Sequence, residues 1–128
     1  MKLWGGRFKK PTDPLFESFG RTLESDQRLV HHDLRACVAH ILMLTEGGVL
    51  NAEESDSLVR GLREIGTELD GGAAITGNDE DIHSWVERRL QEKVGSLASS
   101  IRIGRSRNDL VVTDFRLYVM EACHDLRH

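Results

Sequence analysis

Three arginines, a serine and an asparagine lie within one short run, from Arg102 to Asn108. The guanidinium group of arginine can pair a carboxylate or phosphate through two parallel hydrogen bonds. Ser106 and Asn108 add short, directional donors, and Gly104 allows the backbone to approach a ligand closely. Because a helix is expected to begin just after this run, its free N–H groups and positive dipole end would add to the attraction. The run therefore has the composition of an anion site.

A purely structural role accounts for the same residues. The arginines could form ion pairs at the surface, and Asn108 or Asp109 could cap the following helix. On spacing alone this alternative is favoured, because most charged clusters are simply solvated. The residue types by themselves leave both interpretations open.

The elements that would position this run are helices. Apolar residues recur at helical spacing in four stretches, and glycine pairs follow the first two of them. No alternating strand pattern competes, so the sequence predicts an all-α fold. The expected helices run from Ser25 or Asp26 to 46, from 52 to 69, from about 78 to 94, and from 109 onward. The segment 1–20 is expected to be an extended arm anchored by Leu3, Trp4 and Phe8, and 96–100 a polar linker.

The composition excludes several classes of function. Seventeen Lys and Arg against 21 Asp and Glu give a net charge of −4, and no aromatic residue interleaves the arginines, so nucleic acid is not an expected partner. Cys37 and Cys123 form no CxxC pair, and the histidines lack metal-ligand spacing, so neither a disulfide framework nor a metal is expected. We see no secretion signal and no run long enough to cross a membrane, which favours a cytoplasmic location.

Three motifs together resemble one enzyme family. The run Gly104-Arg105-Ser106-Arg107-Asn108-Asp109, followed by Val112-Thr113-Asp114, resembles the first signature region of argininosuccinate lyases, which belong to the fumarase/aspartase superfamily. Residues 3–8 (Leu-Trp-Gly-Gly-Arg-Phe) are similar to the N-terminal signature of that family, and residues 80–87 to the segment before the first signature region. The motifs occur in the family order, and the resemblance covers essentially the whole chain.

The resemblance implies an architecture and a reaction. Residues 1–108 would be the N-terminal arm and helical domain, and residues 109–128 the start of the first long helix of a central bundle domain. The reaction would be the β-elimination of argininosuccinate to arginine and fumarate, a step of arginine biosynthesis, with no metal or organic cofactor. The family enzymes are homotetramers whose active sites take residues from three subunits.

The resemblance also implies roles for individual residues. Ser106, Arg107 and Asn108 match substrate-contacting positions, and Thr22 matches a substrate-binding serine. Asp81, His83 and Arg105 would support the site. The structural alternatives are that Thr22 caps the first helix, that Asp81 complements the dipole of the third, and that His83 is an ordinary surface histidine.

The chain departs from the family pattern near the proposed site. Arg102-Ile103 stands where a His-Thr pair is usual, and Leu110 where a glutamine is common. The regions that hold the family's Thr-His pair and catalytic serine loop are absent, so we expect no catalytic residue here and no cleavage by the 128-residue chain. The alternative is a stand-alone, non-catalytic module that binds a dicarboxylate or a lyase subunit. The apolar stripe of the last helix is expected to favour self-association.

Overall fold

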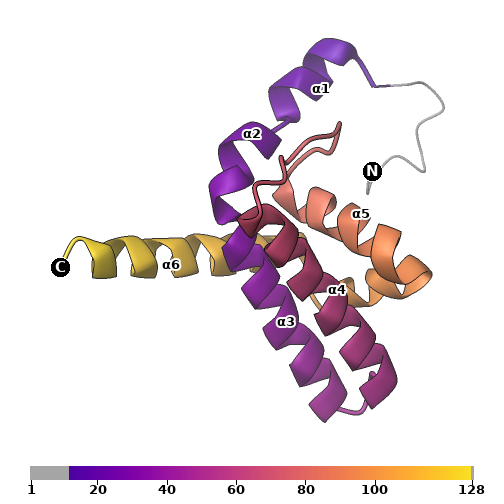
Figure 1. Ribbon diagram of the computed structural model, residues 1–128. Helices are drawn as coiled ribbons and strands as arrows, with labels where there is room; N and C mark the ends of the chain where they lie inside the picture. The colour runs from indigo at the N-terminus through magenta and orange to yellow at the C-terminus, as the bar shows by residue number, and fades with distance from the viewer. Residues whose placement is uncertain (1–11, 128) are drawn as a thin grey trace.

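The computed structural model describes residues 12–127, and within that range every regular element is a helix (Figure 1). The all-α prediction is therefore confirmed. In chain order the elements are α1 (Pro14–Gly20), α2 (Leu23–Asp26), the 3₁₀ helix η1 (Gln27–Leu29), α3 (Val30–Glu46), α4 (Ala52–Asp70), α5 (Ile82–Val94), the 3₁₀ helix η2 (Gly95–Arg102) and α6 (Arg107–Asp125).

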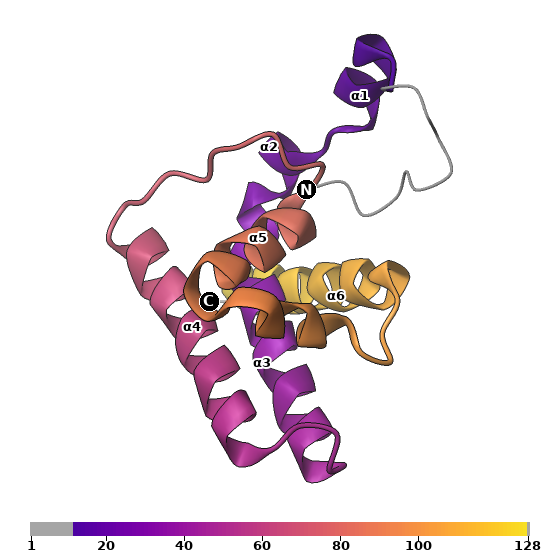
Figure 2. The same ribbon diagram turned by 90° about the vertical axis from the view of Figure 1, so that its right-hand side faces the viewer.

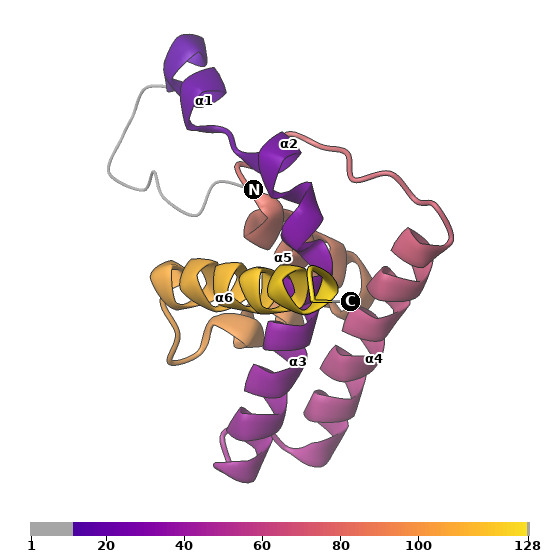
Figure 3. The same ribbon diagram turned by 90° about the vertical axis from the view of Figure 1, so that its left-hand side faces the viewer.

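Helices α3 and α4 form an antiparallel hairpin, and the two helices lie side by side in all three views (Figures 1–3). The turn between them uses Gly48 at a φ of 72°, a conformation that side chains disfavour. Asn51 then opens α4 with a capping box: its side chain accepts from the Glu54 backbone N–H at 2.9 Å, and the Glu54 carboxylate accepts from the Asn51 N–H. Local backbone geometry and capping therefore fix the turn of the hairpin and the start of α4.

Helix α5 packs against this hairpin and completes the apolar core. A long connection arches from the end of α4 to the start of α5 (Figure 2), and the Trp85 indole N–H donates to the Thr76 carbonyl at 3.0 Å. One face of α5 is fully buried, including Ile82, Val86 and Leu90, against Leu58 and Ile65 of α4.

Helix α6 crosses α3, and its C-terminal half projects beyond the other helices (Figures 1 and 3). Leu110 and Asp114 are the buried residues of α6. Large apolar side chains on the rest of the helix are exposed, including Phe115 at 59% and Met120 at 68%. The expected apolar stripe thus lies open in this chain, while self-association itself remains a prediction.

The prediction of an extended arm was wrong for the part of it that the structure describes. Pro14 to Gly20 is the helix α1, because Asp13 caps it by accepting from the Leu15 N–H at 2.8 Å and Pro14 occupies the first turn, where its missing N–H costs nothing. The anchors Leu3, Trp4 and Phe8 lie outside the described residues.

Two further predictions need correction. The expected polar linker at 96–100 lies within the 3₁₀ helix η2, because Ala98 and Ile101 turn inward onto the core at a spacing of three residues. The first helical stretch begins at Leu23 rather than at Ser25 or Asp26, and α6 begins at Arg107 because Ser106, not Asn108 or Asp109, takes the N-cap position.

Candidate functional site

The run that was singled out in the sequence forms the N-terminus of α6. Gly104 reverses the chain at a φ of 68°, and Ser106 follows in extended conformation. The Ser106 hydroxyl oxygen accepts from the Asn108 N–H at 3.1 Å, and the Ser106 N–H donates to the Asp109 carboxylate at 2.8 Å. The side chains of Ser106 and Asn108 lie exposed at this helix end. The geometry is that of a capped helix terminus with polar groups facing outward.

Arg107 joins this terminus to the start of α5. Its Nη2 donates to the Ser84 hydroxyl and to the Asp81 carboxylate, each at 2.6 Å, and its Nη1 lies 3.6 Å from the Glu80 carboxylate. Asp81 is buried and also caps α5 by accepting from the Ser84 N–H at 2.8 Å. Two helix N-termini are therefore held together by one guanidinium group, and the charge of Arg107 is largely balanced within the chain.

Thr22 is brought to the same corner through Glu80. The Thr22 N–H donates to the Glu80 carbonyl at 2.8 Å, and the Thr22 hydroxyl donates to the Asp26 carboxylate at 2.5 Å. Thr22 occupies the N-cap position of α2 without a side-chain capping bond. The structure thus places Thr22, Asp81 and Ser106 at the starts of three helices whose chain segments touch.

Arg105 and Arg102 also have partners within the chain. Arg105 Nη2 donates to the Ile101 carbonyl at 3.0 Å and contacts the Cys37 sulfur at 3.4 Å. Arg102 Nη2 lies 3.1 Å from the carboxyl group of Glu87, which is buried. Burial raises the pKa of Glu87, and the positive charge of Arg102 partly offsets that rise. Arg102 therefore supplies a cation to a buried acid, which gives the departure from the family pattern a structural role.

These side chains line one small cavity, of about 50 Å³, behind the start of α6. It is large enough for water but not for a dicarboxylate. Its walls come from α3, α5, η2 and α6, and include Cys37, His83, Arg105 and Leu110. Ser106, at the α6 terminus, also lines this cavity.

His83 is buried, which excludes the alternative of an ordinary surface histidine. Its Nδ1 lies 3.0 Å from Asp33 of α3 and 3.6 Å from Asp114 of α6. Burial lowers the pKa of His83, but the hydrogen bond to Asp33 and the nearby carboxylates outweigh it, so the net shift is upward. Sequence reasoning assigned no role to Asp33 or Asp114; the available signal was an aspartate on the inward face of each helix, with Asp114 four residues after the buried Leu110.

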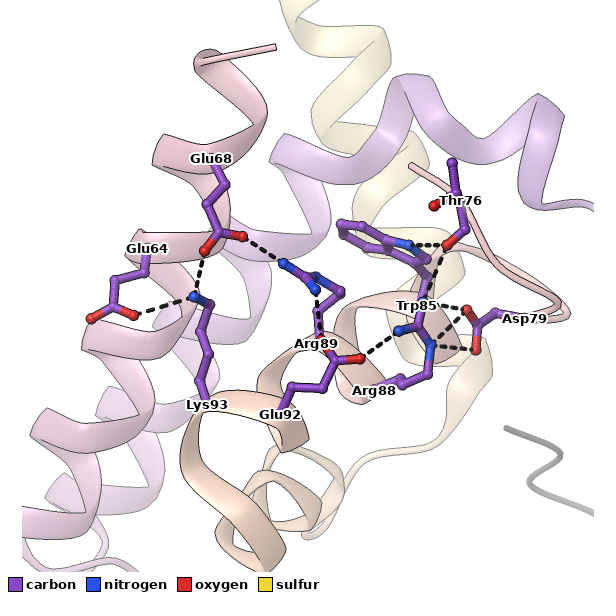
Figure 4. A network of polar contacts seen from close by, with 9 residues as sticks. All are labelled: Glu64, Glu68, Thr76, Asp79, Trp85, Arg88, Arg89, Glu92 and Lys93. Carbon is purple, nitrogen blue, oxygen red and sulfur yellow. Dashed lines mark hydrogen bonds and ion pairs between the residues drawn. The ribbon is translucent and has the colours of Figure 1, made fainter. Parts of the chain in front are cut away.

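A second cavity, of about 160 Å³, lies on the opposite side of α5, beside Trp85 and Arg88. Its cations are already paired: Arg88 with Asp79 and Glu92, and Arg89 with Glu68 (Figure 4). Since these donors are occupied by carboxylates of the chain itself, this cavity is a weaker candidate for an anion than the α6 terminus.

Comparison with known proteins decides the family. A protein-family model described as "Lyase" matches residues 6–128, nearly the whole chain. The chain belongs to this lyase family. The family's N-terminal domain is all-α, as the described residues are, and none of the helices within 12–127 has the length and apolar character needed to cross a membrane.

Individual relatives of the chain are named argininosuccinate lyase. The chain is 46% identical over 121 residues to argininosuccinate lyase from Hahella chejuensis, covering 94% of this chain and 26% of that protein. It is 47% identical over 121 residues to that of Thermoanaerobacter pseudethanolicus (94% and 27%), and 41% identical over 127 residues to that of Clostridium botulinum strain Hall (98% and 29%). The chain therefore spans about a quarter of the length of these relatives, and the resemblance to the N-terminal portion of argininosuccinate lyases is confirmed.

Proposed function

We propose that this chain supplies the carboxylate-binding corner of an argininosuccinate lyase-type active site, in which argininosuccinate is split into arginine and fumarate. The observation that carries the proposal is the α6 terminus: Ser106 and Asn108 are exposed there, on a helix start that Arg107 fixes to Asp81. In this role Ser106, Asn108 and Thr22 contact the substrate, with Arg107, Asp81, His83 and Arg105 holding them in place.

The chemistry explains why such a corner is needed. β-Elimination removes a weakly acidic proton next to a carboxylate, and the extra negative charge that develops must be stabilised by hydrogen-bond donors. A helix N-terminus supplies N–H groups and a favourable dipole for that charge. The hydroxyl of Ser106 and the side-chain amide of Asn108 add further donors on exposed residues.

In this proposal Arg107 orients the site, although its guanidinium group would suit direct binding of a carboxylate. Because its guanidinium group is engaged by Asp81, Ser84 and Glu80, we infer that it acts mainly by orienting the α6 terminus. A substrate carboxylate would meet a guanidinium whose charge is already compensated, so the hydroxyl and amide donors matter more. The same argument applies to Arg105, which Ile101 and Cys37 hold inward.

In this proposal the chain contributes binding and no catalytic base, so alone it releases no fumarate from argininosuccinate. The N-terminal helical unit would extend to about residue 108, and α6 would continue into the bundle. The exposed apolar face of α6, with Phe115 and Met120, would pack against other helices of a homotetramer. We propose that this enzyme acts in the cytoplasm.

A chimera tests the proposal. The corresponding first quarter of the Hahella chejuensis enzyme is replaced with this chain, and fumarate release from argininosuccinate is followed by ultraviolet absorbance. We expect an active chimera whose kcat/KM falls about a hundredfold or more with Asn108→Ala or Ser106→Ala, since each removes a donor to developing charge. Ser99→Ala, an exposed serine on η2, is the matched control and should leave the rate unchanged. An active chimera that tolerates Asn108→Ala and Ser106→Ala, or a folded but inactive one, would contradict the proposal.

A further inference from the structure

Three acidic and basic side chains meet where α3, α5 and α6 cross. Asp33, His83 and Asp114 are each at most 9% exposed, and one ligand-type atom from each lies within 4.8 Å of the others. His83 Nδ1 bonds to Asp33 at 3.0 Å. The residues are 50 and 31 positions apart in the sequence, so the tertiary fold alone brings them together. The cluster is the polar centre of an otherwise apolar junction.

Asp114 is the unusual member of this cluster. Its side chain is 0% exposed, and no N–H or O–H donor within residues 12–127 forms a hydrogen bond to either of its carboxylate oxygens. His83 Nδ1 is 3.6 Å away and is already bonded to Asp33. A buried carboxylate without donors is costly, and it becomes more so when a second carboxylate faces it.

One proton resolves this conflict. If Asp114 is protonated, its O–H becomes a donor, and the Asp33 carboxyl, with an oxygen within 4.8 Å, is the acceptor that faces it. Asp33 then accepts from both His83 and Asp114, and the three side chains carry one negative and one positive charge. One of the two orphaned oxygens becomes a donor, and with a protonated His83 the cluster is electrically neutral.

We propose that Asp33, His83 and Asp114 form a proton-sharing cluster, with Asp114 donating its proton to Asp33, that fixes α6 against α3 and α5 and thereby positions Ser106 and Asn108. Asp114 lies about two helical turns from the α6 terminus. Because a helix is stiff over two turns, a change in how Asp114 meets Asp33 moves the terminus with it. Asp33 and Asp114 are positioning residues in this scheme and touch no ligand.

The surrounding charges from each packed element agree with this assignment. On α3, the Cys37 thiol lies 4.0 Å from Asp33, and its pKa is raised mainly by burial, so it stays uncharged. From the α5 side, Asp81 adds negative potential at His83, and from the loop before α6, Arg105 adds a positive one. Burial, followed by the charge of Asp33, raises the pKa of Asp114 to about 8, against the opposing effects of His83 and Arg105.

An NMR titration of the chain tests the cluster. Aspartate carboxyl carbons and backbone amides are labelled and followed from pH 5 to 9.5. We expect the Asp114 carboxyl to titrate far above its ordinary range, and the amides of Ser106, Arg107 and Asn108 to shift with the same midpoint. In Asp114→Asn, which keeps a donor toward Asp33, these amides should hold their low-pH positions throughout. Asp56→Asn, on the exposed face of α4, should leave the wild-type titration intact.

Two outcomes would overturn the proposal. Asp114 titrating in its ordinary acidic range would remove the shared proton, and amides at the α6 terminus that ignore the Asp114 titration would remove the positioning role. The wild-type titration decides both points even if a variant fails to fold. A divalent cation is the competing occupant of these three side chains, so zinc chloride added at pH 6.5 should leave the Asp114 and His83 signals in place; stoichiometric shifts there would also overturn the assignment.

The positioning of Ser106 and Asn108 matters for a ligand only if the proposed function holds. The cluster and the proposed function can nevertheless be contradicted by different results. An Asp114 titration far above the ordinary aspartate range with coupled amides, together with no response of the chain to added fumarate, would contradict the proposed function and leave the cluster intact. Fumarate binding to the wild-type chain that stays the same from pH 6 to pH 9 would contradict the cluster and leave the proposed function intact.

Discussion

The two faces of α5 carry similar residues in different surroundings. On the outer face, Arg89 and Lys93 each pair with Glu68 of α4 at 2.6 Å (Figure 4). The side chain of Arg89 is 31% exposed and that of Lys93 is 18% exposed. On the inner face, His83 meets Asp33 and Asp114, whose side chains are almost completely buried. Exposed ion pairs are worth little because water screens them, whereas a buried charge that loses its partner is heavily destabilising.

The difference indicates what each face is for. The outer network uses up its own donors: each of its cations contacts two carboxylates, as Lys93 does with Glu64 and Glu68. On the inner side, the polar groups at the α6 terminus stay exposed, and under our proposal the buried cluster holds that terminus in place. A ligand site is therefore expected beside the inner cluster rather than within the outer network.

Removing one cation from each face should give the largest contrast. His83→Ala leaves Asp33 buried without its partner and should lower the free energy of unfolding by about 3–5 kcal/mol. Lys93→Ala removes a cation with two carboxylate partners but should cost less than about 1 kcal/mol, because those partners are exposed. Urea unfolding measures both, and equal losses would remove the distinction between the two faces.

The pH dependence of stability should come from the inner face. The pKa of Asp114 is raised to about 8 and that of His83 is also raised, so the folded chain holds protons that the unfolded chain has released. This contribution is fully present below about pH 4 and is lost as pH rises through about 8. Stability should fall by about 2 kcal/mol between pH 6 and pH 8. Asp114→Asn should flatten much of that slope, and an unchanged slope in this variant would contradict the assignment.

At the α6 terminus, substitutions of Ser106 and Asn108 should separate the effect of helix capping on stability from the effect on fumarate binding. Ser106→Ala removes the N-cap side chain and should cost about 1 kcal/mol of stability. Asn108→Ala, at an exposed side chain, should change stability by less than about 0.5 kcal/mol while weakening fumarate binding. Thermal unfolding with and without fumarate compares the two. A large loss of stability in Asn108→Ala would assign that side chain to the fold instead.

The smallest effect should come from screening the outer face. Raising the salt concentration from 0.1 to 1 M shortens the Debye length to about 3 Å and should weaken the coupling between Arg89 and Glu68, itself below about 1 kcal/mol. A double-mutant cycle with Arg89→Ala and Glu68→Ala at both salt concentrations measures this coupling. The same cycle on His83 and Asp33 should respond far less, because water and ions do not reach them.

The sequence predicted the long helices well, because their apolar periodicity is the same signal that builds the core. α4 was expected from 52 to 69 and runs from Ala52 to Asp70. It predicted short elements poorly: α1 depends on one Asp-Pro start, and η2 has a three-residue repeat that is too brief to stand out in a polar stretch. Local capping, rather than periodicity, decides such segments.

At the candidate site, the sequence singled out the segment that begins α6 but not the partners of its side chains. Arg107 was expected to contact a ligand, and nothing in the sequence indicated its ion pair with Asp81, 26 residues earlier in the chain. The role of Asp114 was also hidden, because an aspartate on an amphipathic helix normally faces water. Only the crossing of α6 over α3 buries it against Asp33. Pairings across distant helices depend on tertiary packing, which local sequence patterns do not encode.

A fumarate titration of the ¹⁵N-labelled chain at pH 6.5 tests the contrast between the two faces most directly. We expect saturable shifts at the backbone amides of Ser106 and Asn108 and at the Asn108 side-chain amide, with no response at Arg89, Glu92 or Lys93. Shifts centred on the outer network, or none at Ser106 and Asn108 at saturating fumarate, would contradict that contrast.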